Sequence, residues 1–408
     1  MFGGPMTRGT SSVSTATDVR LLYAARGLRG FGDGFAVIIL PAYLSAIGYS
    51  TLQIGIVATA ALLGSAVLTL AVGFFAPRHD LRNLLLAGAA LVALTGFAFP
   101  ASEHIAVVLA VAFFGTINPS TGDSGVLVPL EHAMLARGVA DRERTAAFAR
   151  YSLTGALAGA AGSLAAATPD ALAWTGVAQV TAFKLMFLLY AVLGLASAAL
   201  YRHLPHVEMR ETPSTPLGPS RGTVYKLAAL FSLDSFAGGL AVQSMLALWL
   251  FERFDLSLSG ASLFFFWSST LGAFSFPVAA WLSKRIGLVN TMVFTHIPSS
   301  LFLILAVFAP NLIVALALLL ARSALSQMDV PTRTSYVMAV VTPAERTAAA
   351  SVTAVPRGLA SSISPALTGA LLATPVAGLP FIACGVLKIV YDLALLYSFR
   401  HVKPPEER

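Results

Sequence analysis

The residues of this sequence that could do chemistry are charged side chains inside long apolar stretches. An ionised group within a lipid bilayer costs from about 3 to more than 10 kcal/mol, so each needs a partner, a water-filled cavity or a changed protonation state. Carboxyl groups in such places can carry protons, and guanidinium groups can bind anions. The charged residues of this kind are Arg26, Arg29, Asp33, Asp123, Glu131, Arg150, Asp234, Arg322, Asp329, Arg333, Arg357, Lys388 and Asp392.

Asp123 lies in a stretch whose proline and glycine residues disfavour a straight helix. The stretch runs from Gly115 to Gly125 and contains Asn118 and Pro119. Broken helices expose backbone carbonyls that hold a cation or a polar substrate, and burial favours the neutral form of an aspartate. We therefore predict that Asp123 and Asn118 contact the ion or the substrate, with a structural ion pair of Asp123 as the alternative.

Asp33 is the second candidate for a proton site. It follows Arg29 by about one helical turn, so the alternative is that the two side chains neutralise each other. Arg29 and Arg357 are candidates for binding an anionic substrate.

Arg322 is the strongest anion-binding candidate. It stays charged at physiological pH and offers a fork of donors that suits a carboxylate or phosphate. Asp329 lies about two turns later at a comparable depth and is itself a candidate for coupling. The alternative for Arg322 is neutralisation by Asp329 or by Asp123.

Two further pairs have a less specific interpretation. Glu131 and Arg333 occupy equivalent positions near the ends of two apolar stretches with opposite charges, which predicts a gate pair, or else two solvated helix-end charges. Lys388 and Asp392 are four residues apart and are predicted to form a structural ion pair on one helix. His296 is predicted to serve packing or hydrogen bonding.

The composition of the chain indicates which kind of secondary structure positions these side chains. The chain has 408 residues, of which 57% are hydrophobic and 11% charged, with a mean hydropathy of +0.79. Soluble domains have roughly 25% charged residues, so this is an integral membrane protein. A helix needs about 20 apolar residues to span the bilayer, which predicts an all-α protein with twelve transmembrane helices. The spans lie near 22–47, 52–76, 84–101, 105–136, 146–167, 180–201, 226–251, 258–282, 287–309, 311–340, 347–373 and 376–399.

The net charge of +7 follows from basic residues at alternate helix ends. By the positive-inside rule both termini are cytoplasmic, and nucleic-acid binding is not expected. Cys384 is the only cysteine, which excludes disulfides and a cysteine-ligated metal site within one chain. We expect no cofactor and no metal.

The two halves of the chain are related by an internal repeat. Glu143 to Ala147 recurs as Glu345 to Ala349, and Phe31 to Val37 resembles Phe236 to Val242. Both correspondences run in the same direction, so the halves should be related by an axis along the membrane normal. The predicted organisation is a disordered cytoplasmic tail over 1–18, six-helix bundles over 19–202 and 226–400, a cytoplasmic linker over 203–225 and a cytoplasmic tail over 401–408.

The loops resemble those of the major facilitator superfamily. The loop after the second span keeps the family's glycine and basic residues as Gly73, Arg78 and Arg82, although Pro77 replaces its acid and Asp80 its second glycine. The equivalent loop of the second half keeps Arg285 and Gly287. The family's acid and arginine loop is matched by Glu143 and Arg144, and again by Glu345 and Arg346.

This resemblance implies two pseudo-symmetric bundles whose first, fourth, seventh and tenth spans line a central cavity. It implies a secondary active transporter that works by alternating access and moves a small molecule. The buried carboxylates favour proton coupling, and the substrate is either a small organic anion or an amphiphilic drug-like compound. A uniporter and a transport-inactive receptor or scaffold are alternatives, and an enzyme is not expected. We expect a monomer in the lipid bilayer, located in the inner membrane of a bacterium.

Overall fold

The structure is a computed structural model that describes residues 11–120, 125–140, 143–207, 217–342, 345–376 and 378–400. Its helices are α1 (Ser11–Ala46), α2 (Thr51–Phe75), η1 (Ala76–Arg78), α3 (Leu81–Ala98), η2 (Phe99–Ala101), α4 (Ile105–Phe114), α5 (Leu127–Gly138), α6 (Arg144–Ala165), α7 (Thr168–Ala173), α8 (Gln179–Tyr201), α9 (Arg221–Gly239), α10 (Gln243–Phe254), α11 (Leu258–Ile286), α12 (Leu288–Val307), α13 (Leu312–Ser326), α14 (Asp329–Val340), α15 (Arg346–Leu372) and α16 (Leu379–Phe399).

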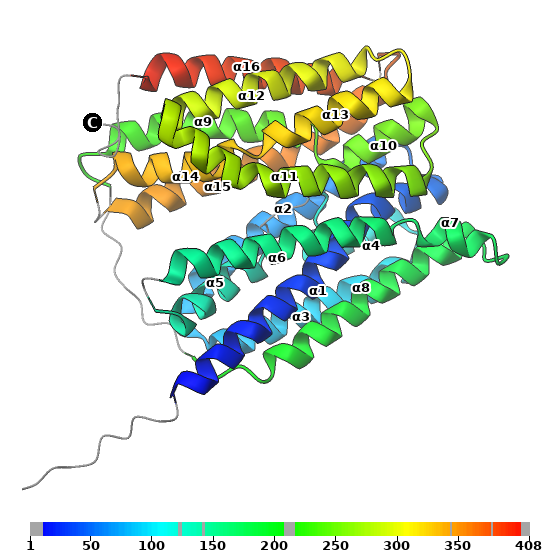
Figure 1. The fold of residues 1–408 in the computed structure, drawn as a ribbon. Helices are drawn as coiled ribbons and strands as arrows, with labels where there is room; N and C mark the ends of the chain where they lie inside the picture. Colours follow the sequence, from blue (N-terminus) through cyan, green and yellow to red (C-terminus); the bar gives the residue numbers. More distant parts are fainter. Residues whose placement is uncertain are drawn as a thin grey trace, which may run out of the picture.

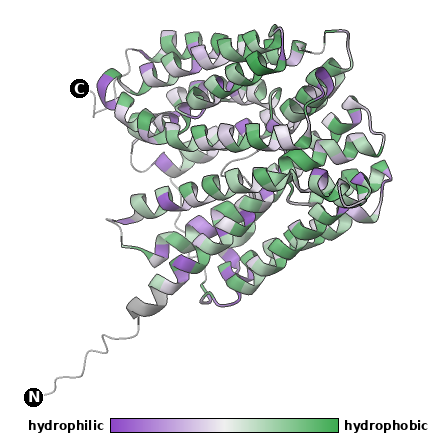
Figure 2. Cartoon of the chain, turned by 45° about the vertical axis from the view of Figure 1, so that its right-hand side comes forward, coloured by the Kyte–Doolittle hydropathy of each residue, from purple (hydrophilic) through white to green (hydrophobic). Residues whose placement is uncertain are grey.

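Each of the twelve predicted spans contains helix in the described part of the chain. Eight segments are long and apolar enough to cross a membrane by length and composition. Figure 2 shows the hydrophobic colour along most of the length of these helices. The remaining predicted spans correspond to α1, α6, α15 and the pair α4 and α5, which carry more polar residues or are interrupted. The fold is therefore an all-α membrane fold.

Three of the predicted spans are broken, the first of them within the Gly115–Gly125 stretch that was expected to weaken a straight helix. The span over 105–136 divides into α4 and α5, the span over 226–251 into α9 and α10, and the span over 311–340 into α13 and α14. The break after α9 follows Gly239, where an added Cβ would lie 2.5 Å from the backbone oxygen of Ser361 in α15. Glycine permits this close approach of two backbones. The breaks place irregular backbone next to the centre of the molecule.

Two of the predicted boundaries also move. The tail predicted over 1–18 is helical from Ser11, because residues 11–18 contain no proline or glycine to prevent helix. The linker was predicted to end at residue 225, but it ends at residue 220, since α9 begins at Arg221.

The helices form two bundles with matching internal contacts. In the first, α1 packs on α6 and α8, α3 on α8, and α2 on α4. In the second, α9 packs on α15 and α16, α12 on α16, and α11 on α13. Figure 1 shows the two bundles as separate layers, with the start of α1 and the end of α16 on the same side of the molecule. The two halves therefore have equivalent architecture, as the sequence repeat predicts.

The bundles touch most extensively along α2 with α15 and α6 with α11, and α1 also packs on α10. At the start of α2, an added Cβ on Gly55 would lie 2.4 Å from the backbone oxygen of Pro365, and one on Gly369 would lie 2.4 Å from that of Thr51. The backbone N–H of Ala366 also donates to the Oγ1 of Thr59 at 2.9 Å. We call this contact the glycine seal. It closes the molecule on the side of the loop that connects α1 and α2.

Candidate functional site

A cavity of about 440 Å³ lies between the two bundles. Five of its lining side chains are basic and three are acidic, which gives the described lining an excess of positive charge. It is also rich in hydroxyl groups, with ten serines, and poor in aromatic rings, with Phe265 and Phe276. The charged lining residues are Arg26, Asp33, Asp234, Arg322, Asp329, Arg333, Arg357 and Lys388.

Arg322 is a cation of this cavity with no ion-pair partner among the described residues. One predicted partner, Asp329, instead bonds Arg333 at 2.6 Å, and the other, Asp123, lies outside the described residues. Ser299, Ser323 and Ser326 line the same cavity. A half-buried guanidinium in a cavity that also offers hydroxyl groups can bind a carboxylate or a phosphate.

Arg357 lines the same cavity on α15 and donates from Nε to the hydroxyl of Ser235 at 3.1 Å. A neutral hydroxyl does not offset its positive charge, and no ion pair of Arg357 forms within the part of the chain that the structure describes. The structure therefore brings together two of the three predicted anion-binding arginines, Arg322 and Arg357.

A network of ion pairs joins four helices of the second bundle. Asp234 of α9 accepts from Arg333 of α14 at 3.0 Å and from Lys388 of α16 at 2.7 Å. His296 of α12 bonds Asp392 of α16 at 3.1 Å. The predicted pair of Lys388 with Asp392 is therefore wrong, because bundle packing offers each side chain a partner on another helix. The hydrogen-bonding role predicted for His296 is confirmed.

The first bundle contains one central ion pair. Arg29 of α1 bonds the fully buried Glu131 of α5, which also accepts from the hydroxyls of Tyr151 and Tyr201. Neutralisation of Arg29 by Asp33 is thus wrong, since Glu131 takes that role. The predicted gate pair does not form in this conformation: Glu131 pairs within the first bundle and Arg333 within the second. Gating by these residues stays a prediction for the opposite conformation.

The Arg29–Glu131 pair of the first bundle and the Asp234–Arg333 pair of the second occupy equivalent positions with the charges reversed. The register that aligns Phe31 with Phe236 places Arg29 on Asp234, and the register of the recurring loop places Glu131 on Arg333. The first bundle has its cation on α1 and its anion on α5, and the second has its anion on α9 and its cation on α14. The sequence contained this signal, because both registers were available without a structure.

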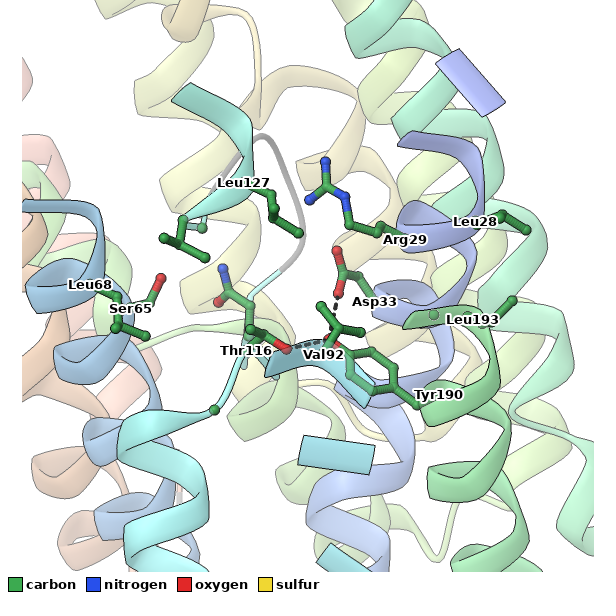
Figure 3. Close-up of a pocket in the computed structure, with 15 residues that line it drawn as sticks. Leu28, Arg29, Asp33, Ser65, Leu68, Val92, Thr116, Leu127, Tyr190 and Leu193 are labelled. Atoms are coloured by element: carbon green, nitrogen blue, oxygen red, sulfur yellow. Dashed lines mark hydrogen bonds between the residues drawn. The ribbon is translucent and has the colours of Figure 1, made fainter. Parts of the chain in front are cut away.

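A smaller pocket lies inside the first bundle next to Asp33 (Figure 3). Asp33 accepts a hydrogen bond from the hydroxyl of Tyr190 at 3.4 Å, and Tyr190 is 3.3 Å from the hydroxyl of Thr116. The side-chain oxygen of Asn118 accepts from the backbone and the hydroxyl of Ser120, each at 3.0 Å, and so stabilises the turn after α4. Asp33 lines both this pocket and the central cavity, which connects it to both spaces.

Asp123 lies outside the described residues, so its predicted role stays a prediction. Among the loop residues, Arg82 contacts His206 at 2.9 Å, and Arg285 lies 4.2 Å from the ring of Trp281. Gly287 joins α11 to α12 with a φ of 86°, a conformation that favours glycine.

The other loop residues have plainer surroundings. Gly73 has open space where a side chain would point, and Arg78 is exposed. Arg346 donates to the backbone oxygen of Met338 at 3.2 Å. Glu143 is exposed before α6, and the side chain of Arg144 lies outside the description. These positions shape the loops and lie away from the cavity.

Glu345 has the most specific of these loop roles. Its carboxylate accepts from the hydroxyls of Thr342 at 2.6 Å and Ser220 at 2.7 Å, and from the backbone N–H of Gly218 at 2.5 Å. It thereby ties the start of α9 to the start of α15. These donors, led by Thr342 and Ser220, lower the pKa of Glu345 to about 2.

Replacing Glu345 by Gln should lower the melting temperature of the detergent-solubilised protein at pH 7. A carboxyl whose pKa is lowered by folding contributes stability that is present above its unfolded pKa and is lost as the pH falls through the folded value. The difference between wild type and E345Q should therefore shrink as the pH falls from about 4.5 toward 2. The control is Glu103→Gln, which removes an exposed carboxylate paired with Lys184 and should change little. A difference independent of pH would contradict this assignment.

Comparisons with known proteins agree with this architecture. The model of the Major Facilitator Superfamily matches residues 22–233 and 227–408. An uncharacterized membrane protein of Saccharomyces cerevisiae, YJR124C, is 26% identical over 421 residues, which cover 94% of each chain. The inward-open xylose transporter XylE from E. coli is 14% identical with a TM-score of 0.75, covering 95% of this chain and 98% of that one. The nucleoside transporter NupG is 12% identical with a TM-score of 0.75, covering 94% and 100%. The chain belongs to the Major Facilitator Superfamily and is a membrane transporter of small solutes.

Proposed function

We propose that this protein is a proton-coupled secondary transporter of a small organic anion. The observation that carries the proposal is Arg322, a cation in the central cavity with no ion-pair partner in the described residues. Keeping such a charge away from water is costly unless a ligand compensates it. An anionic substrate supplies that compensation, and the protein then releases it by alternating access.

The chemistry of the cavity favours an anion over an amphiphilic cation. Five basic against three acidic lining residues repel a cation, and two phenylalanines provide little aromatic surface for one. The ten serines offer hydrogen bonds to a substrate that carries oxygen atoms. We therefore propose hydroxylated carboxylates as the substrate class.

Proton coupling is supported by carboxyl groups at the cavity. Asp234 and Asp329 are held by cations, whereas Asp33 has a single long hydrogen bond from Tyr190. Asp33 is thus the candidate of the first bundle for a carboxyl that changes protonation during transport, and Asp123 remains a second. A uniporter would need no such group.

The orientation and location extend the same proposal. We place both termini in the cytoplasm, so the glycine seal closes the outer side and the central cavity faces inward. The bacterial inner membrane stays a prediction, since the curated relative is a yeast protein. A lipid-modifying enzyme built on Glu131 is disfavoured because Arg29 and two tyrosines occupy that carboxylate.

Uptake into proteoliposomes tests this function. The substrates are lactate, gluconate and citrate, compared with ethidium as an amphiphilic cation, each with and without an imposed pH gradient. We expect at least one carboxylate to accumulate with the gradient and to leak out when a protonophore collapses it. Movement of ethidium without any carboxylate would overturn the anion assignment, and accumulation indifferent to the gradient would overturn proton coupling.

A further inference from the structure

Asp392 of α16 is a fully buried carboxyl group with a single hydrogen-bond partner. Its Oδ1 lies 3.1 Å from Nδ1 of His296, whereas its Oδ2 is buried and has no partner within the described residues. An ionised carboxylate with one oxygen deprived of donors pays the full penalty of desolvation, which a bound proton relieves. This carboxyl group is therefore built to hold a proton.

His296 links this carboxyl group to the central cavity. Its Nε2 lies 3.3 Å from Nζ of Lys388 and 3.9 Å from Oδ1 of Asp234. Lys388 donates to that same oxygen of Asp234 at 2.7 Å. His296, Lys388 and Asp234 all line the cavity, whereas Asp392 lies behind them. Among the contacts described, the imidazole of His296 is the one route by which a proton from the cavity can reach Asp392.

We propose that Asp392 and His296 form a proton-binding dyad whose loading releases Lys388 toward the anion. This inference rests on the proposed function. In the unloaded state Nδ1–H of His296 donates to the Asp392 carboxylate, and Nε2 accepts from Lys388. On loading, Nε2 takes a proton from a hydronium ion in the cavity, which leaves as water, while the Nδ1 proton passes to Oδ1 of Asp392. The imidazole remains neutral with its proton on the other nitrogen, and the dyad has gained one proton.

The loaded state changes what Lys388 can contact. Nε2 now carries a hydrogen, so it repels the ammonium group and competes with it for Oδ1 of Asp234. Lys388 loses its contact with Nε2 and is held more weakly by Asp234, so its charge can shift toward the cavity that contains Arg322. Proton binding then raises the affinity for an anion, and by linkage the anion raises the affinity for the proton. This reciprocity is what a proton and anion symporter requires.

Each helix packed around the dyad carries other charged or titratable groups. Arg333 forms ion pairs with both Asp234 and Asp329. The electrostatic potential at the dyad is therefore the sum of several opposite charges. On α11 the basic residues lie in the last turn, at the end of the helix. The groups are Asp234 on α9, Lys284 and Arg285 on α11, Arg322 on α13, Asp329 and Arg333 on α14, Arg357 on α15, and Cys384, Lys388 and Tyr391 on α16.

Infrared difference spectroscopy of the ligand-free protein against pH tests the dyad directly, with the proton as the probe. We expect a protonated-carboxyl band that disappears as the pH rises and is missing in Asp392→Asn. His296→Gln should shift the frequency of that band, because its hydrogen-bond partner has changed. The control Asp170→Asn removes a carboxylate of α7 that accepts from Ser259 and should keep the band.

A band that persists unchanged in Asp392→Asn would overturn the proposal. Should that variant not fold, Lys388→Gln decides: loss of the neighbouring cation favours the protonated form, so the midpoint must move to higher pH, and an unmoved midpoint overturns the dyad. Because no substrate is present, the result is independent of the transport assay. A normal titration without carboxylate uptake would count against the proposed function alone, whereas uptake without the band would count against the dyad alone.

Discussion

Replacing Arg322 by Gln should reduce carboxylate uptake by about 30-fold or more, while leaving the protein as stable as before or slightly more stable. Truncating one partner of a buried, hydrogen-bonded charge pair costs roughly 2 to 5 kcal/mol of binding, and each 1.4 kcal/mol is about tenfold. In the substrate-free protein Arg322 has no ion pair to lose within the described residues, so its removal relieves a half-buried charge. Uptake in proteoliposomes and the melting temperature are measured on the same preparation.

Two control variants define what the loss means. Arg322→Lys keeps the charge without the planar fork of donors and should retain part of the activity. Arg253→Gln removes an exposed arginine near the end of α10 and should leave uptake unchanged. Full activity in R322Q would remove the main support for an anionic substrate. A large drop in melting temperature would instead assign Arg322 a structural role.

Glu131→Ala should be strongly destabilising, by roughly 3 to 5 kcal/mol, because it leaves Arg29 buried without its carboxylate. It also deprives the hydroxyls of Tyr151 and Tyr201 of their acceptor. Thermal unfolding in detergent should show the loss as a lower melting temperature. The control Glu103→Ala breaks an exposed pair with Lys184 and should cost at most about 1 kcal/mol.

The reversed charge order of the second bundle suggests a double variant that should restore stability to the first. The double variant Arg29→Asp with Glu131→Arg copies the residues found at Asp234 and Arg333. It should recover a good part of the stability that Glu131→Ala loses, since a pair of opposite charges is restored. A double variant no more stable than either single variant would show that the two tyrosines, and not the charge pair, define this site.

Sequence reasoning predicts the spans well because apolar length is a local property. Apart from α1, which begins at Ser11 and not near 22, the helices begin and end close to the predicted limits even where the chain is interrupted near Pro119 or Gly239. The recurring loop at Glu143 and Glu345 precedes equivalent helices, α6 and α15. The placement of Arg322 at the central cavity is likewise consistent with its position in the tenth span.

The ion-pair partners were the part that local reasoning could not supply. A spacing of four residues favoured Lys388 with Asp392, and a similar spacing favoured Arg29 with Asp33. In the bundle both choices lose to partners on neighbouring helices, Asp234 and Glu131, because packing decides which side chains share a buried space. The repeat registers were the only sequence signal that pointed to these partners.

The glycine seal has a consequence for the kinetics of the transport cycle. The α2 and α15 backbones meet at Gly55 and Gly369 through van der Waals contact and one hydrogen bond from Ala366. No ion pair has to be broken there, so separating the two helices costs mainly dispersion energy, which falls off within a fraction of an ångström. This part of the barrier to separating the bundles is therefore set over a very short displacement. The hydrogen bonds from Ser259 of α11 to Asp170 of α7 also join the two bundles and act over a longer distance, so they would be the last contacts to resist separation.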